Sequence, residues 1–348
     1  MHSPVMNRTQ ILITGGAGFI GSHFVHYMLD HYPEYTIINL DKLTYAALAG
    51  IPAPEPSERY TFIKGDICNR ELVEHLFAAH QIRHVIHFAA ESHVDQSILH
   101  PDRFVVTNVL GTQVLLDVSW KYWSSQRQAS DNDGMTHNRF HHISTDEVYG
   151  SLGETGYFTE NSPYAPNSPY SASKASSDMM VRSYHKTYGM NTVITNCSNN
   201  YGPGQHSEKL IPTIIRKALS NEPIPIYGAG KNIRDWLHVL DHCRGIDRAF
   251  HRGRAGETYA LGGNQELDNL TVATMICDIL NDVAKLERDR PPRSYRELIT
   301  FVTDRLGHDY RYAIYAGKAN QELDWSPQIE FEQGLRETVM WYKERLRP

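Results

Sequence analysis

The chain has 348 residues, with 34 Lys and Arg against 40 Asp and Glu, so its formal net charge is −6. A hydrophobic content of 41% and a charged content of 21% are ordinary for a globular enzyme and exclude a disordered or low-complexity chain. Scattered basic residues argue against nucleic-acid binding, and no apolar run reaches the ~18 residues of a membrane span. At roughly 150 residues per domain, we expect about two domains or one large α/β unit with an elaboration.

The N-terminus and the cysteines indicate the compartment. The first ten residues lack the basic and then apolar segments of a secretory signal. Cys68, Cys197, Cys243 and Cys277 are far apart and fit neither a zinc site nor a disulfide framework. We therefore expect free thiols, a cytoplasmic location and no bound metal.

The first two-thirds of the chain alternates short β-branched runs with stretches of helical apolar spacing. The predicted strands are 11–14, 36–41, 61–64, 84–88, 140–144 and 192–196, and the predicted helices are 19–32, 70–80, 102–123 and 169–188. Strands that are apolar throughout and alternate with helices predict a parallel sheet covered on both faces. This is the order of an α/β, doubly wound dinucleotide-binding (Rossmann) fold.

After residue 200 the alternation becomes less regular. The predicted strands are 224–227, 236–239, 258–261 and 299–303, and the predicted helices are 210–219, 240–250, 272–282 and 331–345. Two polar, aperiodic stretches, 124–138 and 285–296, are predicted loops. The pattern predicts a smaller α/β lobe that is partly interleaved with the sheet.

A glycine-rich segment follows the first predicted strand and begins the first predicted helix. Gly15, Gly18 and Gly21 allow a tight turn, close approach of a pyrophosphate and close helix–strand packing, with the phosphates at the helix N-terminus. Asp41 ends the next strand, where an acid binds a ribose 2′-hydroxyl and repels a 2′-phosphate. The pattern favours NAD over NADP, although Lys42 weakens that preference. The alternative is a glycine turn without a ligand.

Two further segments follow predicted strands. Asp66 comes after the third strand, where it could reach an adenine or be an ordinary turn aspartate. Phe88, Ala89 and Ala90 come after the fourth strand and include small residues where a cofactor would cross the strand ends.

Tyr170 and Lys174 are four residues apart and hence on one face of a predicted helix. A nearby cation lowers a phenol pKa from about 10, which predicts a tyrosine base. A packed Tyr beside a solvated Lys is the common alternative, but after a dinucleotide fold the pair is expected for hydride transfer. Asp146 and Glu147 follow the fifth strand, at the end where ligands bind in open α/β sheets. Two surface acids are the alternative there.

At this point the chain resembles a known family. Gly-x-x-Gly-x-x-Gly with Tyr-x-x-x-Lys resembles the extended short-chain dehydrogenase/reductases, and Thr-Asp-Glu-Val-Tyr-Gly at 145–150 is similar to nucleotide-sugar dehydratases. Further strings make the chain similar to the dTDP-glucose 4,6-dehydratases from about residue 10 to about residue 342. These strings occupy 89–95, 198–203, 209–212, 234–237 and 305–309.

The resemblance implies an NAD-dependent hydro-lyase that makes dTDP-4-keto-6-deoxyglucose. Tyr170 would take the 4-hydroxyl proton as hydride leaves C-4, with Lys174 and Thr145 orienting the groups. Glu147 would remove the C-5 proton, and protonated Asp146 would protonate the departing 6-hydroxyl before hydride returns to C-6. Because successive strand side chains face opposite ways, both acids can reach one hexose only if the chain leaves strand geometry here.

The resemblance also implies two sets of binding residues. The cofactor set is Gly15, Gly18, Phe19, Ile20, Gly21, Asp41, Lys42, Asp66, Ile67, Phe88, Ala89, Ala90, Ser92, Thr107, Tyr170, Lys174 and Asn200. The substrate set is Ser92, Thr145, Asn199, Lys209, Leu210, Pro225, Tyr227, Arg234, Asn269 and His308. Lys209 and Arg234 suit a diphosphate, because a point charge and a fork both neutralise phosphate oxygens.

The resemblance further implies how the chain is divided and assembled. Residues 1–200 would form the NAD-binding domain, with 240–262 returning to it, and 201–348 would mainly bind the nucleotide sugar. A homodimer would form through helices 102–123 and 169–188. The chain departs from the family pattern at 46–49, where Ala-Ala-Leu-Ala replaces the usual Gly-Asn, at Gln96, and in a longer 124–138 loop.

Three other functions stay open. A sugar 4-epimerase or decarboxylase needs the Tyr and Lys but not the Asp–Glu pair. A UDP- or GDP-linked 4,6-dehydratase is possible because the choice of base depends on few contacts. A non-catalytic NAD-sensing protein would be free to lose Tyr170, Lys174 or Glu147, and all three are present.

Overall fold

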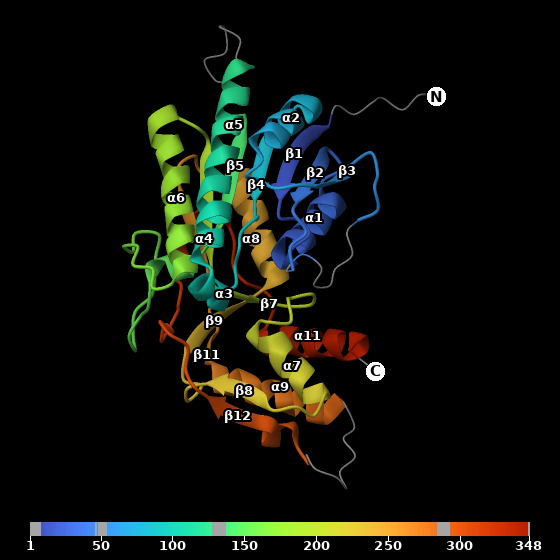
Figure 1. Cartoon of the computed structure of the whole chain (residues 1–348), viewed down its shortest axis with the longest axis vertical. Helices are drawn as coiled ribbons and strands as arrows, with labels where there is room; N and C mark the ends of the chain where they lie inside the picture. The colour runs from blue at the N-terminus through green and yellow to red at the C-terminus, as the bar shows by residue number, and fades with distance from the viewer. Residues whose placement is uncertain (1–7, 46, 48–53, 127–136, 284–292, 347–348) are drawn as a thin grey trace.

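The structure is a computed structural model that describes residues 8–45, 47, 54–126, 137–283 and 293–346. Within these residues, a seven-stranded sheet has the strand order β10-β6-β5-β4-β1-β2-β3, and every neighbouring pair is parallel (Figure 1). Its strands are β1 (Thr9–Thr14), β2 (Tyr35–Asp41), β3 (Tyr60–Lys64), β4 (His84–His87), β5 (Arg139–Thr145), β6 (Thr192–Cys197) and β10 (Thr258–Leu261). This order confirms the predicted doubly wound fold.

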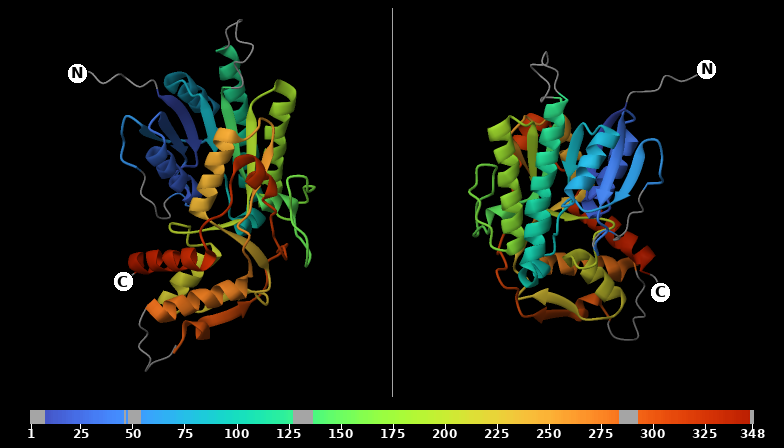
Figure 2. Two further views of the ribbon diagram at one scale, coloured as in Figure 1. Left: turned by 180° about the vertical axis from the view of Figure 1, so that it is seen from behind. Right: turned by 45° about the horizontal axis from the view of Figure 1, so that its top comes forward.

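Helices cover both faces of this sheet, as the uniformly apolar strands predict. One face carries α2 (Arg70–His80), α5 (Thr112–Ser125) and α6 (Pro169–Tyr188), and the other carries α1 (Phe19–His31) and α8 (Val239–Arg252), with α10 (Gly317–Leu323) beside α8 (Figure 2). Successive residues of β1 enter different cores: Leu12 packs under α2 and α5, whereas Ile11 and Ile13 pack under α1 and α8.

The bounds of α6 follow from its capping residues. Ser168 forms a capping box with Ser171, and Pro169 occupies the first turn, where its missing N–H costs nothing. Gly189 ends the helix in the left-handed conformation, with φ 66°. These signals fix the helix at its predicted bounds.

The predicted helix 102–123 is continuous but not uniform. It consists of α4 (Pro101–Phe104), a π-helical segment η1 (Val105–Gly111) and α5. Such wide turns are frequent at functional sites. A further short helix, α3 (Val94–Leu99), was not predicted.

A second group of elements lies below the large sheet in Figure 1 and has its own apolar core. It contains α7 (Leu210–Leu219), α9 (Asn269–Val283), α11 (Phe331–Arg345), the 3-10 turn η3 (Tyr295–Leu298) and the parallel strands β8 (Ile224–Tyr227) and β12 (Ile299–Val302). Between the two groups lies a three-stranded sheet of β7 (Asn199–Tyr201), β9 (Ile233–His238) and β11 (Glu266–Asp268).

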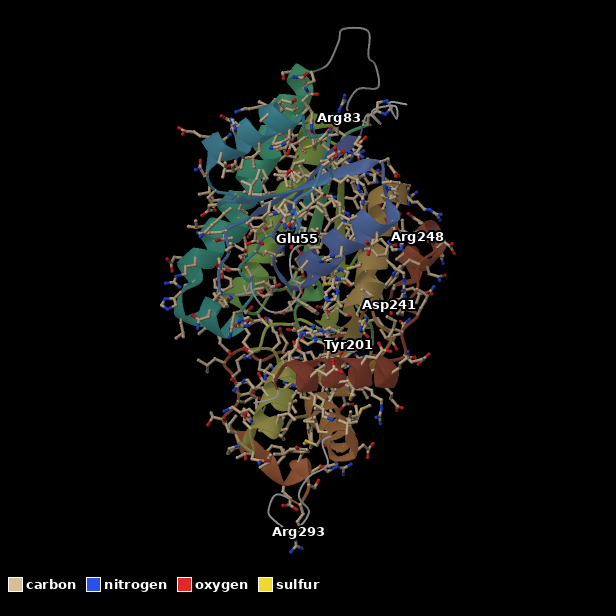
Figure 3. The ribbon with its side chains drawn as sticks, turned by 90° about the vertical axis from the view of Figure 1, so that its right-hand side faces the viewer. Glu55, Arg83, Tyr201, Asp241, Arg248 and Arg293 are labelled. Atoms are coloured by element: carbon tan, nitrogen blue, oxygen red, sulfur yellow. The ribbon has the colours of Figure 1, made fainter. Side chains whose placement is uncertain are left out.

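Tyr201, labelled in Figure 3 close to α11, lies where the two groups meet. Its ring packs against Phe331, with ring centroids 5.0 Å apart. Asp241, labelled near the start of α8, accepts backbone hydrogen bonds from Gln328 and Ile329. These buried contacts join the segment before α11 to the helices of the large sheet.

A few expectations differ in detail or fall outside the described residues. The strand β9 begins at Ile233 rather than at 236, because its first residues pair with β11. Most of the predicted loop 124–138 and residues 285–292 of the predicted loop 285–296 lie outside the described part, as does the unusual 46–49 stretch apart from Ala47. Tyr295 and Arg296 belong to η3 and are therefore not loop residues.

Candidate active site

A cavity lies at the carboxyl ends of the large sheet, beside the β1–β4 boundary where the strand order reverses. Segments that end or follow all of β1 to β6 contribute to its wall, together with α6 and with Gln205, His206, Glu208 and Lys209. Ligand-binding crevices of open α/β sheets form at this position. Every residue of the predicted cofactor set lines the cavity, and so do Thr145, Asp146, Glu147, Tyr170 and Lys174.

The glycine-rich loop after β1 packs so closely against its neighbours that side chains would not fit there. Gly15 has φ +74°, and a Cβ there would lie 2.5 Å from the Ala89 nitrogen. A Cβ on Gly21 would lie 2.3 Å from the Gly15 oxygen. The helix α1 begins at Phe19 with no side-chain cap and no acidic residue in its first turn. Its N-terminus therefore suits the phosphates of a dinucleotide.

Asp41 ends β2 and lines the same cavity. Its two carboxylate oxygens accept hydrogen bonds from the Ala17 nitrogen at 2.9 Å and the Leu43 nitrogen at 2.8 Å. Lys42 points to Asp66, with 2.7 Å between ammonium and carboxylate. Because its charge is paired with Asp66, Lys42 does not favour a 2′-phosphate, and the geometry fits the predicted preference for NAD over NADP.

Tyr170 and Lys174 project from α6, and both side chains are buried. Lys174 Nζ donates a 2.8 Å hydrogen bond to the Ile143 carbonyl and lies 3.4 Å from His142 Nε2. Burial lowers the pKa of Lys174 to about 8. Burial, together with the charge of Glu147, raises the pKa of Tyr170 well above its usual range. The expected lowering of the Tyr170 pKa is therefore wrong for this structure, because desolvation of the phenolate and the charge of Glu147 outweigh the hydrogen bond with Thr145 that lowers this pKa.

The chain leaves strand geometry at the predicted point. β5 ends at Thr145, and Asp146–Tyr149 form a 3-10 turn, η2, in which the Thr145 hydroxyl accepts from the Glu147 nitrogen at 3.3 Å. This turn lets Asp146 and Glu147 both line the cavity, which a regular strand would prevent. The condition set by the sequence for two acids at one hexose is met.

The carboxyl groups of Asp146 and Glu147 have different charged neighbours. Burial and the neighbouring charge of Glu147 raise the pKa of Asp146 well above its usual range, and one Asp146 carboxylate oxygen has no hydrogen-bond partner in the described structure. Burial also raises the pKa of Glu147, but Lys209 and Arg234 oppose this effect. The arrangement favours a proton on Asp146 over a proton on Glu147. A protonated Asp146 is in the state of a general acid, and an ionised Glu147 is in the state of a general base.

The predicted substrate residues divide into two groups. Ser92, Thr145, Asn199 and Lys209 line the cavity, and Lys209 Nζ donates to the Ser92 carbonyl at 3.0 Å. The others do not line it and come from β8, β9, α7, α9 and the segment before Asp309: these are Leu210, Pro225, Tyr227, Arg234, Asn269 and His308.

Part of that second group gathers around Arg234. The guanidinium lies 4.4 Å from the Tyr312 ring centroid and donates to the Asp309 carbonyl. The rings of Tyr227 and His308 are 6.2 Å apart, and both Glu147 and His308 lie within the electrostatic reach of Arg234. In the described residues, neither Arg234 nor Lys209 forms an ion pair with a carboxylate.

Several residues around the site escaped sequence reasoning. Glu91, Gln205, His206 and Glu208 line the cavity, and Glu208 contacts His206 at 3.3 Å. Their positions follow from loop geometry, for which the sequence has no signal. The described residues include no cluster of His, Cys, Asp and Glu suited to a metal ion, and none of their helices has the length and apolarity to cross a membrane.

Comparison with known proteins shows which proteins this chain is similar to. The family model described as GDP-mannose 4,6 dehydratase matches residues 12–338. The dTDP-glucose 4,6-dehydratase of Salmonella typhimurium is 50% identical over 343 residues, covering 96% of this chain and 92% of that protein. The enzyme of the same name from Xanthomonas campestris is 51% identical over 332 residues, covering 95% and 92%.

Solved structures agree with these matches. A dTDP-glucose 4,6-dehydratase from Bacillus anthracis in complex with NAD has a TM-score of 0.82 and 47% identity, covering 97% of each chain. The enzyme from Streptomyces venezuelae with NAD and TYD bound has a TM-score of 0.85 and 43% identity, again covering 97% of each chain. A UDP-glucose 4-epimerase from Thermotoga maritima has a TM-score of 0.82 but only 26% identity, covering 97% of this chain and 100% of the other.

Proposed function

This chain belongs to the GDP-mannose 4,6 dehydratase family, and on that premise we propose that it is an NAD-dependent hydro-lyase that converts dTDP-glucose into dTDP-4-keto-6-deoxyglucose. The observation that carries the proposal is the meeting of Asp146 and Glu147 with Tyr170 and Lys174 in one cavity. Bound NAD supplies an acceptor for hydride from C-4 and a donor of that hydride to C-6.

In the first step Tyr170 takes the proton of the sugar 4-hydroxyl. It can do so only as the phenolate, so the phenol that the raised pKa favours in this structure must first lose its own proton to solvent, and the phenolate is then a strong base. Lys174 supplies the positive charge on the same helix face, and Thr145, at the end of β5, supplies a hydroxyl that hydrogen-bonds the Tyr170 phenol. Both residues orient the tyrosine and the sugar.

In the second step Glu147 and Asp146 carry out the elimination. A ketone at C-4 acidifies the hydrogen at C-5, and we assign its removal to Glu147. Burial raises the pKa of this carboxyl, which makes its ionised form a stronger base, and Lys209 and Arg234 act against the shift in favour of that form. Asp146 holds the proton that the departing 6-hydroxyl needs, because burial and Glu147 disfavour its charge. The pKa values of two adjacent carboxyl groups are thus driven apart as the chemistry requires.

The glycine loop, the free N-terminus of α1 and Asp41 form the proposed NAD site. The loop leaves no space for a Cβ on Gly15 or Gly21, and both glycines line the cavity. The remaining residues of the cofactor set follow the ends of β2, β3, β4 and β6 or lie on α1, η1 and α6, and we assign them to NAD on the basis of their place in the wall.

Lys209 and Arg234 are the proposed partners of the substrate diphosphate. Both lack a carboxylate partner in the described residues, and both act against the burial that raises the pKa of Glu147, which supports a role for their charge beside the sugar. Pro225 and Tyr227 on β8 and His308, whose ring is 6.2 Å from that of Tyr227, are assigned to the nucleoside. Leu210 and Asn269 begin the neighbouring helices α7 and α9.

Each alternative function differs from the proposed one in the groups that its chemistry requires. A 4-epimerase needs no acid for a departing hydroxyl, so the protonated Asp146 favours a dehydratase. A UDP- or GDP-linked 4,6-dehydratase shares the whole catalytic arrangement and differs only in the base, and the relatives at about half identity favour dTDP-glucose. A non-catalytic NAD-binding protein has no use for this pair of acids.

The test is incubation of the purified chain with dTDP-glucose in D₂O, followed by proton NMR. The expected product has a new 6-deoxy methyl signal and deuterium at C-5. UDP-glucose and a GDP-sugar in parallel tubes report the choice of base. A 4-epimer, or no turnover of any nucleotide sugar, contradicts the proposal.

We also propose that the chain forms a homodimer and acts in the cytoplasm. Exposed apolar residues gather on η1 and α6, including Val105, Val106, Leu110 and Met179, which supports a partner on this face. All four cysteines are free thiols, in keeping with a reducing compartment. Residues 1–200 with 240–262 would hold NAD and 201–348 would mainly hold the nucleotide sugar.

A further inference from the structure

The catalytic helix carries a third buried group in line with the first two. Tyr170, Lys174 and Asp178 occur at successive four-residue intervals on α6 and so share one helix face. Lys174 is 4% exposed and Asp178 is 1% exposed. Burying one charge without a partner is costly, so the two charges require an explanation together.

A histidine from the neighbouring strand lies between them. His142 Nε2 on β5 is 3.4 Å from Lys174 Nζ and 3.2 Å from one Asp178 oxygen, and the His142 side chain is fully buried. Burial lowers the pKa of His142 well below its usual value, so the imidazole is neutral. The ammonium and the carboxylate therefore face each other across a polar group without charge.

The other Asp178 oxygen is fixed by donors from three parts of the chain. It accepts hydrogen bonds from Ser144 Oγ at 2.9 Å, Tyr164 Oη at 2.9 Å and Asn196 Nδ2 at 3.2 Å. Asn196 also donates to the Thr145 carbonyl at 3.0 Å. Burial raises the pKa of Asp178, whereas Lys174 and these donors act against that shift, favour the ionised carboxylate and hold it in place.

We propose that Asp178 is a positioning residue for the reaction: it is the buried counter-charge that, across His142, keeps Lys174 as an ammonium beside Tyr170. The inference rests on the proposed function, because the ammonium matters only if Tyr170 exchanges a proton with substrate. Through Ser144 and Asn196, the same carboxylate ties α6 to the strand end that carries Thr145.

The other groups around Lys174 cannot supply this charge. His142 on β5 and His87 on β4, whose rings are 5.2 Å apart, are both kept neutral by burial. Cys197 on β6 is a thiol whose pKa burial raises, and Tyr170 is a protonated phenol. Asp178 is the carboxylate among the described groups that raise the pKa of Lys174, against the burial that lowers it to about 8.

The test compares the pH dependence of kcat in the NAD-loaded wild type and in Asp178→Asn. Loss of the Lys174 proton gives an alkaline limb, and removal of the counter-charge should move that limb down by about 1–3 pH units. Tyr164→Phe is the matched control, because it removes a donor to the same oxygen but leaves the charge, and its limb should stay at the wild-type pH. An unchanged limb in Asp178→Asn overturns the proposal.

A stability cycle keeps the proposal testable if Asp178→Asn folds poorly. Asp178→Asn alone leaves the Lys174 charge buried without its partner, whereas Lys174→Met with Asp178→Asn removes both charges. The double variant should have a higher Tm than Asp178→Asn. A double variant no more stable than Asp178→Asn would show that the hydrogen bonds, not the charge, are the role of Asp178. If wild type itself does not turn over dTDP-glucose, the proposed function fails instead.

Discussion

The cavity receives its reactive groups from two regions of opposite character, the helix α6 and the turn η2. The helix α6 is regular, capped at both ends, and presents Tyr170 and Lys174 at helical spacing. The turn η2 is irregular and presents two adjacent carboxyl groups. The helix holds a cation close to a carboxylate of opposite sign, whereas the turn holds two carboxyl groups side by side.

This difference shows how one buried site maintains two proton states. On α6 a counter-charge opposes the burial that lowers the pKa of Lys174 to about 8. On η2, burial and the like charge of Glu147 act together and raise the pKa of Asp146. The helix is arranged to keep a charge in the interior, and the turn is arranged to keep a proton there.

The largest effect is expected from the helix. Tyr170→Phe removes the proposed base with little change of shape, so kcat should fall by about 10²–10⁴-fold. Steady-state assays with dTDP-glucose measure the loss, and NAD binding by titration serves as the control. Activity within tenfold of wild type would remove Tyr170 from the mechanism.

The turn should separate the two half-reactions. Glu147→Gln should leave the first hydride transfer possible but block the elimination, so that NADH absorbance appears on mixing with dTDP-glucose while the methyl signal of the product stays absent. Rapid-mixing spectroscopy and proton NMR on the same sample read both events. Normal product formation would exclude Glu147 as the base.

A third experiment tests the proton held by the turn. The folded-state pKa of Asp146 is raised above its unfolded value, so the native state binds the proton more tightly and stability falls as pH rises from the unfolded pKa through the folded one. Asp146→Asn cannot ionise, so its Tm should exceed that of wild type at alkaline pH, and the gain should shrink towards acidic pH. Thermal unfolding across pH measures this gain, and a gain that grows at acidic pH contradicts it.

The smallest effect is expected from a change at the N-cap of α6 that leaves the catalytic side chains unchanged. Ser168→Ala removes the N-cap of α6 and should cost about 1 kcal/mol of unfolding free energy. Denaturant unfolding measures the loss. Although Tyr170 lies in the first turn of α6, its side chain is held by the residues that bury it, so kcat should change little. A large loss of kcat with little loss of stability would mean that the cap itself orients the tyrosine.

The same two regions show how far the sequence leads. The bounds of α6 and the shared face of Tyr170 and Lys174 follow from local signals, since a capping residue and a four-residue interval can be recognised in the sequence. The departure of Asp146 from strand geometry was predicted as a requirement, and η2 meets it. The predicted direction of the Tyr170 pKa shift was wrong, because the burial that raises this pKa depends on the segments that pack against α6 and not on the local sequence.

Other features needed the assembled fold. Asp178 was present at the right interval, but only the approach of His142 from β5 and of Asn196 from β6 shows that it faces Lys174. Arg234, Tyr227 and His308 come from segments that are far apart in sequence, and no local sequence pattern predicts that they lie close together. The roles of these residues stay predictions until substrate binding is measured.

The edge strand β10 has a consequence for how the protein is made. The six preceding strands of the large sheet are complete by Cys197, but β6 is covered on its outer edge only when residues 258–261 pair with it. Until then a nascent chain exposes a strand whose six residues are all buried in the finished fold. A fragment ending near residue 200 would carry that unpaired edge permanently, which makes it a template for aggregation rather than a working cofactor module.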